Sequence, residues 1–273
     1  MSSLRVACVQ ITAGRDVPAN IAVASALIRE AAAKGARLIA TPEMTSLMER
    51  NRREMRPKVR TEDEDIALAA FRALAAELGA HLLIGSLPID IGDARLANRG
   101  FLIGPDGAIE ARYDKIHMFD VDLPQGESFR ESNAYRPGES AVVVPVEGAM
   151  LGLSICYDLR FAALYRRLAQ AGAEILAVPA AFTRVTGEAH WHILLRARAI
   201  ETACFVIAPG QTGTHEDGRQ TYGHSLIVDP WGHVLADGGT DVGIITADLD
   251  LDAVKAARGR IPALQHDRVF AGP

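Results

Sequence analysis

The chain has 273 residues, of which 49% are apolar and 23% are charged, so it is long enough to bury the core of one large domain. Its 29 basic and 34 acidic side chains leave a formal net charge of −5, and the basic residues form no stripe, which argues against a nucleic-acid partner. No apolar run is long enough to cross a membrane, and the N-terminus lacks the apolar segment of a signal peptide.

The first half of the chain alternates between apolar strand-like runs and segments with helical periodicity. In chain order we predict a strand over 4–11, a helix over 19–36, a strand over 37–43, a helix over 62–80, a strand over 81–89 and a hairpin over 98–115. The Gly-Pro-Asp-Gly turn inside the last segment marks the hairpin. Residues 48–65 carry charges of both signs, and we interpret them as a solvated surface segment.

The second half repeats this rhythm. We predict two strands over 141–156, a helix over 160–173, a strand over 174–182, a helix over 188–203, a strand over 204–210 and a hairpin over 222–239. No linker rich in Pro, Gly or Ser separates the halves, so we predict a single α/β domain over residues 1–273. Hairpins among βα units predict a mixed sheet, or two sheets, rather than a purely parallel one.

The three cysteines, Cys8, Cys156 and Cys204, form no closely spaced pair. A sparse, odd count is typical of a reducing compartment rather than a secreted disulfide scaffold, and predicts a cytoplasmic location. Cys8 and Cys204 lie inside predicted strands, and we interpret them as core residues. Cys156 differs, because the apolar run "LGLSIC" turns abruptly polar after it.

Two further charged residues stand at the ends of predicted strands. Glu43 closes "LIATPE", and Lys115 follows the second strand of the first hairpin. Alone, each residue has an ordinary interpretation: Cys156 as a small core residue, Glu43 as a carboxylate at a helix start, Lys115 as a surface lysine. Ligands of α/β folds tend to bind beyond the carboxyl ends of strands, so the three side chains are expected to converge.

A carboxylate, an ammonium group and a thiol together can perform nucleophilic catalysis. A thiol with an ordinary pKa is mostly neutral at pH 7 and needs a base. None of the eight histidines is obviously paired with Cys156, so Glu43 could accept the thiol proton. Lys115 could stabilise negative charge on the sulfur and on an oxyanion, and the backbone N–H of Tyr157 could be a second oxyanion donor.

The same residues carry a resemblance to a known family. "TPEM", "YDKIHMFDVDLP" and "SICYDLRF" occur in that order, followed by "GEAHWHILLRARAIET" and "YGHSLIVDPWGHVLA". Over nearly its whole length the chain resembles the nitrilase superfamily of carbon–nitrogen hydrolases, in particular its Nit-type amidases. The resemblance implies a four-layer αββα sandwich, a Glu–Lys–Cys triad made of Glu43, Lys115 and Cys156, and a homodimer or higher homo-oligomer packed through helices.

The resemblance also implies a second active-site glutamate between the lysine and the cysteine. The stretch "GESFRESNAYRPG" offers Glu127 and Glu131. We choose Glu131, because "RES" stands where Nit-type members carry their Glu-Ser pair. Its expected role is to orient Lys115 and the attacking groups.

Several residues near these motifs are candidates for substrate binding. Arg160, four residues after Cys156, could bind a substrate carboxylate, with a structural pair to Asp158 or a neighbouring acid as the alternative. Phe182 and Thr183 resemble pocket positions of the family, with strand-end packing as the alternative. Tyr157 lies next to the nucleophile.

The histidines give no indication of a metal centre. His190 and His192 stand two apart on a predicted helix and therefore point to different faces, so we expect no metal and no cofactor. His224 is interpreted as a hydrogen-bonded histidine near the subunit interface, without a chemical role.

The leading hypothesis is an amidase that cleaves the amide of a small carboxylate through a Cys thioester and releases ammonia, similar to the deaminated-glutathione amidases. The alternatives are an ω-amidase of 2-oxo acids, a nitrilase acting on nitriles, and a scaffold protein that has lost catalysis. A nucleotide-binding α/β protein is disfavoured, because neither G-x-G-x-x-G nor a P-loop follows the first strand.

Overall fold

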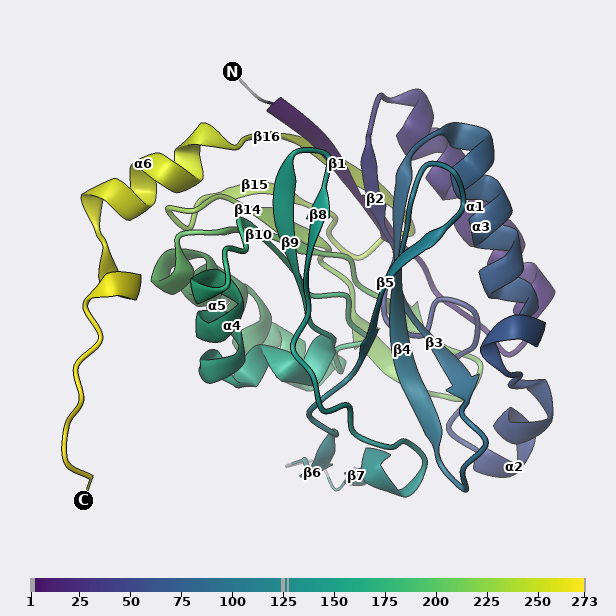
Figure 1. The fold of residues 1–273 in the computed structure, drawn as a ribbon. Coiled ribbons are helices and arrows are strands. Elements are labelled where there is room, and N and C mark those ends of the chain that lie inside the picture. Colours follow the sequence, from purple (N-terminus) through teal and green to yellow (C-terminus); the bar gives the residue numbers. More distant parts are fainter. Residues whose placement is uncertain (1–2, 124–125, 127, 273) are drawn as a thin grey trace.

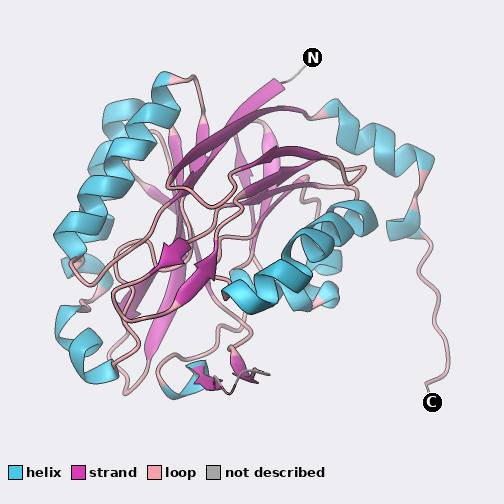
Figure 2. Ribbon diagram, turned by 180° about the vertical axis from the view of Figure 1, so that it is seen from behind, coloured by secondary structure: helices cyan, strands magenta, loops and turns pink. Residues whose placement is uncertain are grey.

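Two six-stranded sheets pack face to face, and helices cover both outer faces (Figure 1). This computed structural model describes residues 3–123, 126 and 128–272. The view from behind shows the same layers, with helices outside and strands within (Figure 2). The arrangement is an αββα sandwich, as predicted.

The first sheet has the order β16-β1-β2-β3-β4-β5. Its strands are β1 (Ser3–Gln10), β2 (Leu38–Ala40), β3 (His81–Asp90), β4 (Leu96–Ile103), β5 (Ile109–Asp114) and β16 (Gly243–Asp250). Strands β1, β2 and β3 are parallel, whereas β16, β4 and β5 pair antiparallel with their neighbours.

The second sheet has the order β8-β9-β10-β11-β14-β15. Its strands are β8 (Val143–Val146), β9 (Ala149–Leu153), β10 (Ile175–Ala177), β11 (Phe205–Ala208), β14 (Leu226–Val228) and β15 (Val234–Asp237). Here β9, β10 and β11 are parallel and the flanking strands antiparallel. The two sheets therefore have the same order of parallel and antiparallel pairs. This agrees with the strand–helix alternation that the two halves of the sequence share.

Helices α1 (Val17–Ala33) and α3 (Ile66–Leu78) cover the first sheet, and α4 (Ala162–Gln170) and α5 (Arg184–Thr202) cover the second (Figure 1). Aspartates start α1 and α3: the side chain of Asp16 accepts from the N–H of Ala19, and that of Asp65 from the N–H of Leu68, both at 2.8 Å. These bonds satisfy N–H groups that the first helical turn leaves free. None of the helices in the described part of the chain is long and apolar enough to cross a membrane.

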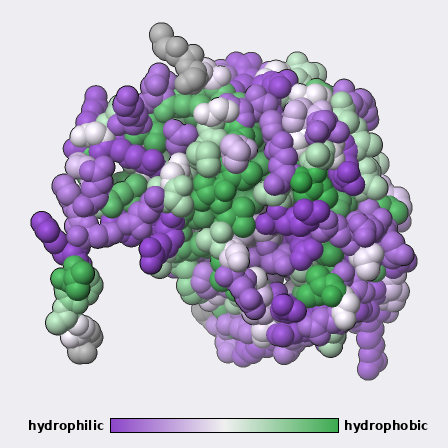
Figure 3. Space-filling view, viewed as in Figure 1, coloured by the Kyte–Doolittle hydropathy of each residue, from purple (hydrophilic) through white to green (hydrophobic). Residues whose placement is uncertain are grey.

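Smaller elements complete the structure. They are the short helix α2 (Arg52–Met55), the two-stranded pairs β6 (Asp120–Asp122) with β7 (Ser128–Arg130) and β12 (Thr212–Thr214) with β13 (Gln220–Tyr222), and the C-terminal helix α6 (Asp252–Arg260). Beyond Asp267, which pairs with Arg166, the chain leaves the body, and the apolar end of this tail stands clear of it (Figure 3).

Some boundaries differ from the prediction for clear reasons. The strands expected over 37–43 and 174–182 shrink to β2 and β10, because Pro42 and Pro179 cannot donate to a sheet ladder. Strand β16 and helix α6 were not predicted. Cys8 lies in β1, but Cys204 lies one residue before β11 rather than inside it; both side chains are fully buried, as expected of core residues.

Candidate active site

Glu43 stands just beyond β2 on a segment that passes very close to β3. A Cβ atom at Gly85 would lie 2.1 Å from the carbonyl oxygen of Thr41 and 2.5 Å from that of Pro42, so only glycine fits there. The Nε2 of Gln211 donates to the Glu43 carbonyl oxygen at 3.0 Å. The buried Glu43 carboxylate is thereby held at the junction of the two sheets, where its Oε2 accepts from the N–H of Ala181 at 2.9 Å.

Cys156 opens a 3₁₀ turn, Cys156–Arg160, just beyond β9. Its φ of +49° is rare for a residue with a side chain, and its N–H donates to the Pro179 carbonyl oxygen at 2.9 Å. Buried Asp158 accepts from the Ile155 N–H at 2.9 Å and from the Tyr113 hydroxyl at 2.7 Å. These bonds hold the strained turn and keep the thiol at the strand end, where such strain is typical of functional sites.

Lys115 follows β5, and only 2% of its surface is exposed. Its ammonium group donates to Glu43 Oε1 at 2.9 Å and to Glu131 Oε2 at 2.8 Å. Glu131 also accepts from the N–H of Phe119 at 2.6 Å. A buried cation is stable only when it is paired, and this one bridges two carboxylates. Glu127, the alternative to Glu131, lies outside the described residues.

Asn98 on β4 joins the same network, and sequence analysis did not identify it. Its Nδ2 donates to Glu43 Oε1 at 2.9 Å and to Glu131 Oε1 at 3.1 Å. Its backbone carbonyl oxygen accepts from the backbone N–H of Lys115 at 3.0 Å. The signal available was a polar residue inside the apolar run "LANRGFLI". Asn98 therefore orients both carboxylates and the lysine backbone.

The charges of the site follow from burial and from these pairings. Burial lowers the pKa of Lys115, but Glu131 and Glu43 outweigh it and raise that pKa well above its usual value. Burial raises the pKa of Glu43, but the charge and hydrogen bond of Lys115 hold it below its usual range. For Cys156, burial and the Glu43 carboxylate raise the pKa well above its ordinary value, against the opposing effect of Lys115. The resting site thus holds a carboxylate, an ammonium ion and a neutral thiol.

These groups open into a pocket of about 240 Å³ that all four side chains, Glu43, Lys115, Glu131 and Cys156, line together. The candidate substrate-binding residues Tyr157, Phe182 and Thr183 also line it. The sequence-predicted residues thus converge on one cavity, with both sheets contributing.

Arg160 lies behind this lining. Its guanidinium group lies 5.8 Å from the ring centre of Tyr157 and 5.3 Å from that of Phe182, and it donates to His190 Nδ1 at 3.3 Å. Asp158 is engaged elsewhere, with His117 Nδ1 at 2.7 Å as well as with Tyr113. The alternative of an Arg160–Asp158 pair is therefore not what the structure contains.

Four other arginines line the pocket: Arg50, Arg52, Arg130 and Arg219. Two of them come from the segment 48–65, which we had interpreted as a solvated surface segment. That interpretation is wrong for part of the segment, because Met48 and Met55 are buried and also line the pocket. Arg50 and Arg52 therefore belong to the lining of the site as well as to the protein surface.

The chain is similar to known proteins over nearly its whole length. The sequence pattern of the family described as carbon-nitrogen hydrolase matches residues 5–259. A deaminated glutathione amidase of Synechocystis sp. is 41% identical over 97% of both chains. The chain belongs to the carbon–nitrogen hydrolase family. The predicted superfamily is thereby confirmed, and the protein is an enzyme of the amidase type that hydrolyses amide C–N bonds.

Solved structures of this family share the fold. The C. elegans NitFhit protein superposes with a TM-score of 0.90 at 36% identity over 98% of this chain and 66% of that longer one. A mutant of the amidase from Nesterenkonia sp. AN1, described as showing covalent addition of the acetamide moiety of fluoroacetamide at the active site cysteine, has a TM-score of 0.83 at 27% identity, over 97% and 94% of the two chains.

Proposed function

We propose that Cys156 is the nucleophile of an amidase reaction in which Glu43 is the base and Lys115 stabilises the oxyanion. The observation that carries this proposal is a neutral thiol beside a buried carboxylate whose pKa is held low, with both groups lining one pocket. As sulfur attacks the amide carbonyl carbon, the thiol proton passes to Glu43, and the carbonyl electron pair moves to oxygen.

The tetrahedral intermediate then collapses to a thioester. Lys115 and the Tyr157 N–H, which stands at the start of a 3₁₀ turn where the helix supplies no acceptor, face the oxyanion. Protonated Glu43 returns its proton to the leaving amine as the C–N bond breaks. Water, deprotonated by Glu43, attacks the thioester, and the freed thiolate recovers the proton. Glu131 and Asn98 hold Lys115 and Glu43 in place through both halves.

A mutant of the Nesterenkonia amidase has the acetamide moiety of fluoroacetamide added covalently at its active site cysteine, which supports a nucleophilic cysteine in this chain. In this chain the nucleophile is expected to be Cys156 rather than Cys8, because Cys8 is a fully buried strand residue that does not line the pocket. The three cysteines are free thiols, which supports the predicted cytoplasmic location.

For the substrate, we propose deaminated glutathione, which gives its name to relatives at 41% and 40% identity. This molecule carries a carboxylate at each end and an amide between its 2-oxo acid part and cysteinylglycine. The four arginines of the pocket lining supply cations for both carboxylates, whereas Arg160 stands behind Tyr157 and Phe182 and does not line the pocket. The leaving amine is then a dipeptide, so the expected release of ammonia applies only to primary amides such as those of the ω-amidase alternative.

Two substrates with the same acyl part distinguish these alternatives. Deaminated glutathione and 2-oxoglutaramate both yield 2-oxoglutarate, which can be quantified in each reaction, and a matched nitrile completes the comparison. We expect kcat/KM to be at least roughly tenfold higher for deaminated glutathione, the value of one charge-assisted contact to the second carboxylate. A preference for 2-oxoglutaramate would indicate an ω-amidase, and a preference for the nitrile would indicate a nitrilase.

We also propose that the protein forms a homodimer through α5 and the β14–β15 hairpin. Exposed apolar side chains gather there: Ile193, Ile200, Trp231, Val234 and Leu235. The two elements adjoin, because Arg196 of α5 donates to the carbonyl oxygen of Gly232 in the hairpin turn at 2.7 Å. Sedimentation velocity should give a dimer for the parent and a monomer for Ile193→Asp.

A further inference from the structure

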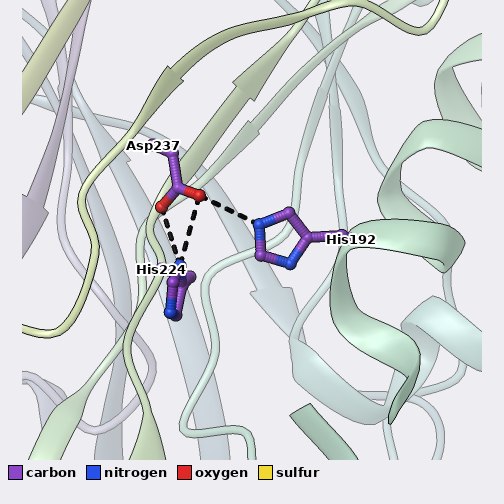
Figure 4. A group of neighbouring side chains, drawn as sticks. All are labelled: His192, His224 and Asp237. Carbon is purple, nitrogen blue, oxygen red and sulfur yellow. Dashed lines mark hydrogen bonds and ion pairs between the residues drawn. The ribbon is translucent and has the colours of Figure 1, made fainter. Parts of the chain in front are cut away.

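Three side chains outside the pocket converge on one point of the surface (Figure 4). His192 projects from α5, His224 precedes β14, and Asp237 ends β15. His192 Nε2 lies 3.0 Å from Asp237 Oδ2, and His224 Nδ1 lies 2.9 Å from Asp237 Oδ1 and 3.2 Å from Oδ2. His192 and Asp237 are 45 residues apart in the sequence, yet the fold brings two imidazoles to one carboxylate.

The spacing of these atoms matches a metal coordination shell. One ligand atom from each residue can be chosen so that all three lie within 4.8 Å of one another. In a tetrahedral zinc site with bonds of about 2.0–2.1 Å, neighbouring ligand atoms stand about 3.3 Å apart. The nitrogen–oxygen distances are those of hydrogen bonds and fall slightly short of that value, so the rings would have to move outward to admit an ion.

The cluster is held in shape by the groups around it. His224 adopts a φ of +50°, its N–H donates to the Gly239 carbonyl oxygen at 2.6 Å, and its carbonyl oxygen accepts from Trp191 Nε1 at 2.8 Å. Its ring stacks on that of Tyr222 at 4.4 Å, and Asp237 Oδ1 also accepts from the Gly239 N–H at 2.9 Å. Such outer contacts fix the orientation of metal ligands.

We propose that His192, His224 and Asp237 bind one divalent transition-metal ion of the Zn²⁺ type. Imidazole nitrogen and carboxylate oxygen are ligands that Zn²⁺ accepts, with water in the fourth position. In the single chain the three side chains are 33%, 24% and 35% exposed, on the elements through which we propose that two copies meet. None of the three lines the catalytic pocket. The ion would tie α5 to the β14–β15 hairpin.

The test is titration of the full-length protein with Zn²⁺, followed by calorimetry. The polyhistidine tag is removed and Cys156→Ala is the background, so that neither the tag nor the pocket thiol competes for the ion. The variants are His192→Gln, Asp237→Asn and His224→Asn. Asparagine suits the positive φ at position 224. The side chain of Asp237→Asn can still form a hydrogen bond to a histidine. His233→Gln is the control, because His233 pairs with Asp229 at 2.9 Å, outside the cluster.

We expect one Zn²⁺ per chain, an affinity at least roughly tenfold weaker in each of the three variants, and an unchanged affinity in His233→Gln. In the same background, Zn²⁺ should raise the Tm, EDTA should reverse the rise, and Asp237→Asn should show none. The proposal would be overturned if the Cys156→Ala background protein showed no saturable Zn²⁺ binding, or if Asp237→Asn bound Zn²⁺ as tightly as that background. The three side chains would then be a hydrogen-bonded cluster without a metal.

Discussion

At the scale of single residues, the side-chain amide of Asn98 connects the two carboxylates of the site. Asn98 Nδ2 donates to both Glu43 and Glu131, so it stabilises the ionised form of two carboxylates that a single lysine bridges. A hydrogen bond to a carboxylate lowers its pKa, and losing the bond raises it. Asn98 is therefore a positioning residue whose removal should be visible in the pH dependence of catalysis.

We predict that Asn98→Leu, which keeps the size of the side chain, lowers kcat by at least roughly tenfold. This is the effect expected from losing one charge-assisted hydrogen bond, at 1.36 kcal/mol per factor of ten. The acid limb of the kcat–pH profile should move to higher pH, because Glu43 would protonate more easily. The profile of Asn98→Leu is compared with that of the parent. An unmoved acid limb together with reduced stability would mean that Asn98 is only structural.

How far the sequence predicts the site depends on where each residue stands. Glu43 and Cys156 each end an apolar run, and Lys115 follows a predicted hairpin strand; these positions mark residues presented at a sheet edge. Asn98 stands inside a run, and its burial depends on the packing of Glu43 and Glu131 from elsewhere in the chain. Arg50 and Arg52 were missed for a similar reason, since the local pattern of residues 48–65 cannot reveal which cavity the segment lines.

At the scale of elements, strand β3 is the support on which the Glu43 segment rests. Gly85 allows that contact, because a Cβ there would meet the backbone oxygens of Thr41 and Pro42 and the side chain of Pro179. Pro42 and Pro179 also end β2 and β10 early. The sequence predicts both strands, and Pro42 already closes the first one, whereas the early end at Pro179 is concealed inside the apolar run over 174–182.

We predict that Gly85→Ala costs about 3 kcal/mol of unfolding free energy or more, since overpacking costs about 1–3 kcal/mol even where neighbours are side chains and backbone atoms yield less. Gly243→Ala in β16 is the matched control, with nothing within 4 Å of the added methyl group, and should be nearly neutral. Urea unfolding midpoints measure both. Equal midpoints for the two variants would contradict the close approach.

At the scale of the whole molecule, pH acts on stability through buried groups. The pKa of Glu43 is lowered, so its contribution is present above the unfolded value of about 4.3 and is lost as pH falls through the folded one. The pKa of Lys115 is raised, so its contribution persists up to the unfolded value of about 10.4. Between these limits the ion pair is constant, and alkaline loss must begin with other groups.

The cysteines supply that loss. Burial raises the pKa of Cys8 to about 12, so above the unfolded value of about 8.5 the unfolded chain loses its proton first and stability falls. At 1.36 kcal/mol per pH unit, Cys8 alone should cost about 2 kcal/mol between pH 8.5 and pH 10. Cys8→Ala should lose about that much less than the parent over this interval, measured by urea unfolding under reducing conditions. Equal alkaline losses would contradict the assignment.

The architecture as a whole is the part that the sequence predicts best. The rhythm of strands and helices repeats in both halves, and the two sheets share one order of parallel and antiparallel pairings. What escapes prediction is the return of the chain: β16, 233 residues or more from its partner β1, completes the first sheet. Such long-range pairing leaves no local signal, because the partner strand cannot be identified from either segment alone.

The central claim is that Cys156 performs the nucleophilic attack, and the most direct measurement is the rate of 2-oxoglutarate formation from deaminated glutathione by Cys156→Ala. The matched control is Cys204→Ala, which removes a buried thiol outside the pocket. We predict that Cys156→Ala, folded like the parent by circular dichroism, is slower by at least roughly ten-thousand-fold, as expected for the loss of a nucleophile, whereas Cys204→Ala stays within tenfold, roughly, of the parent. A folded Cys156→Ala protein that turns over at the rate of the control would contradict the account.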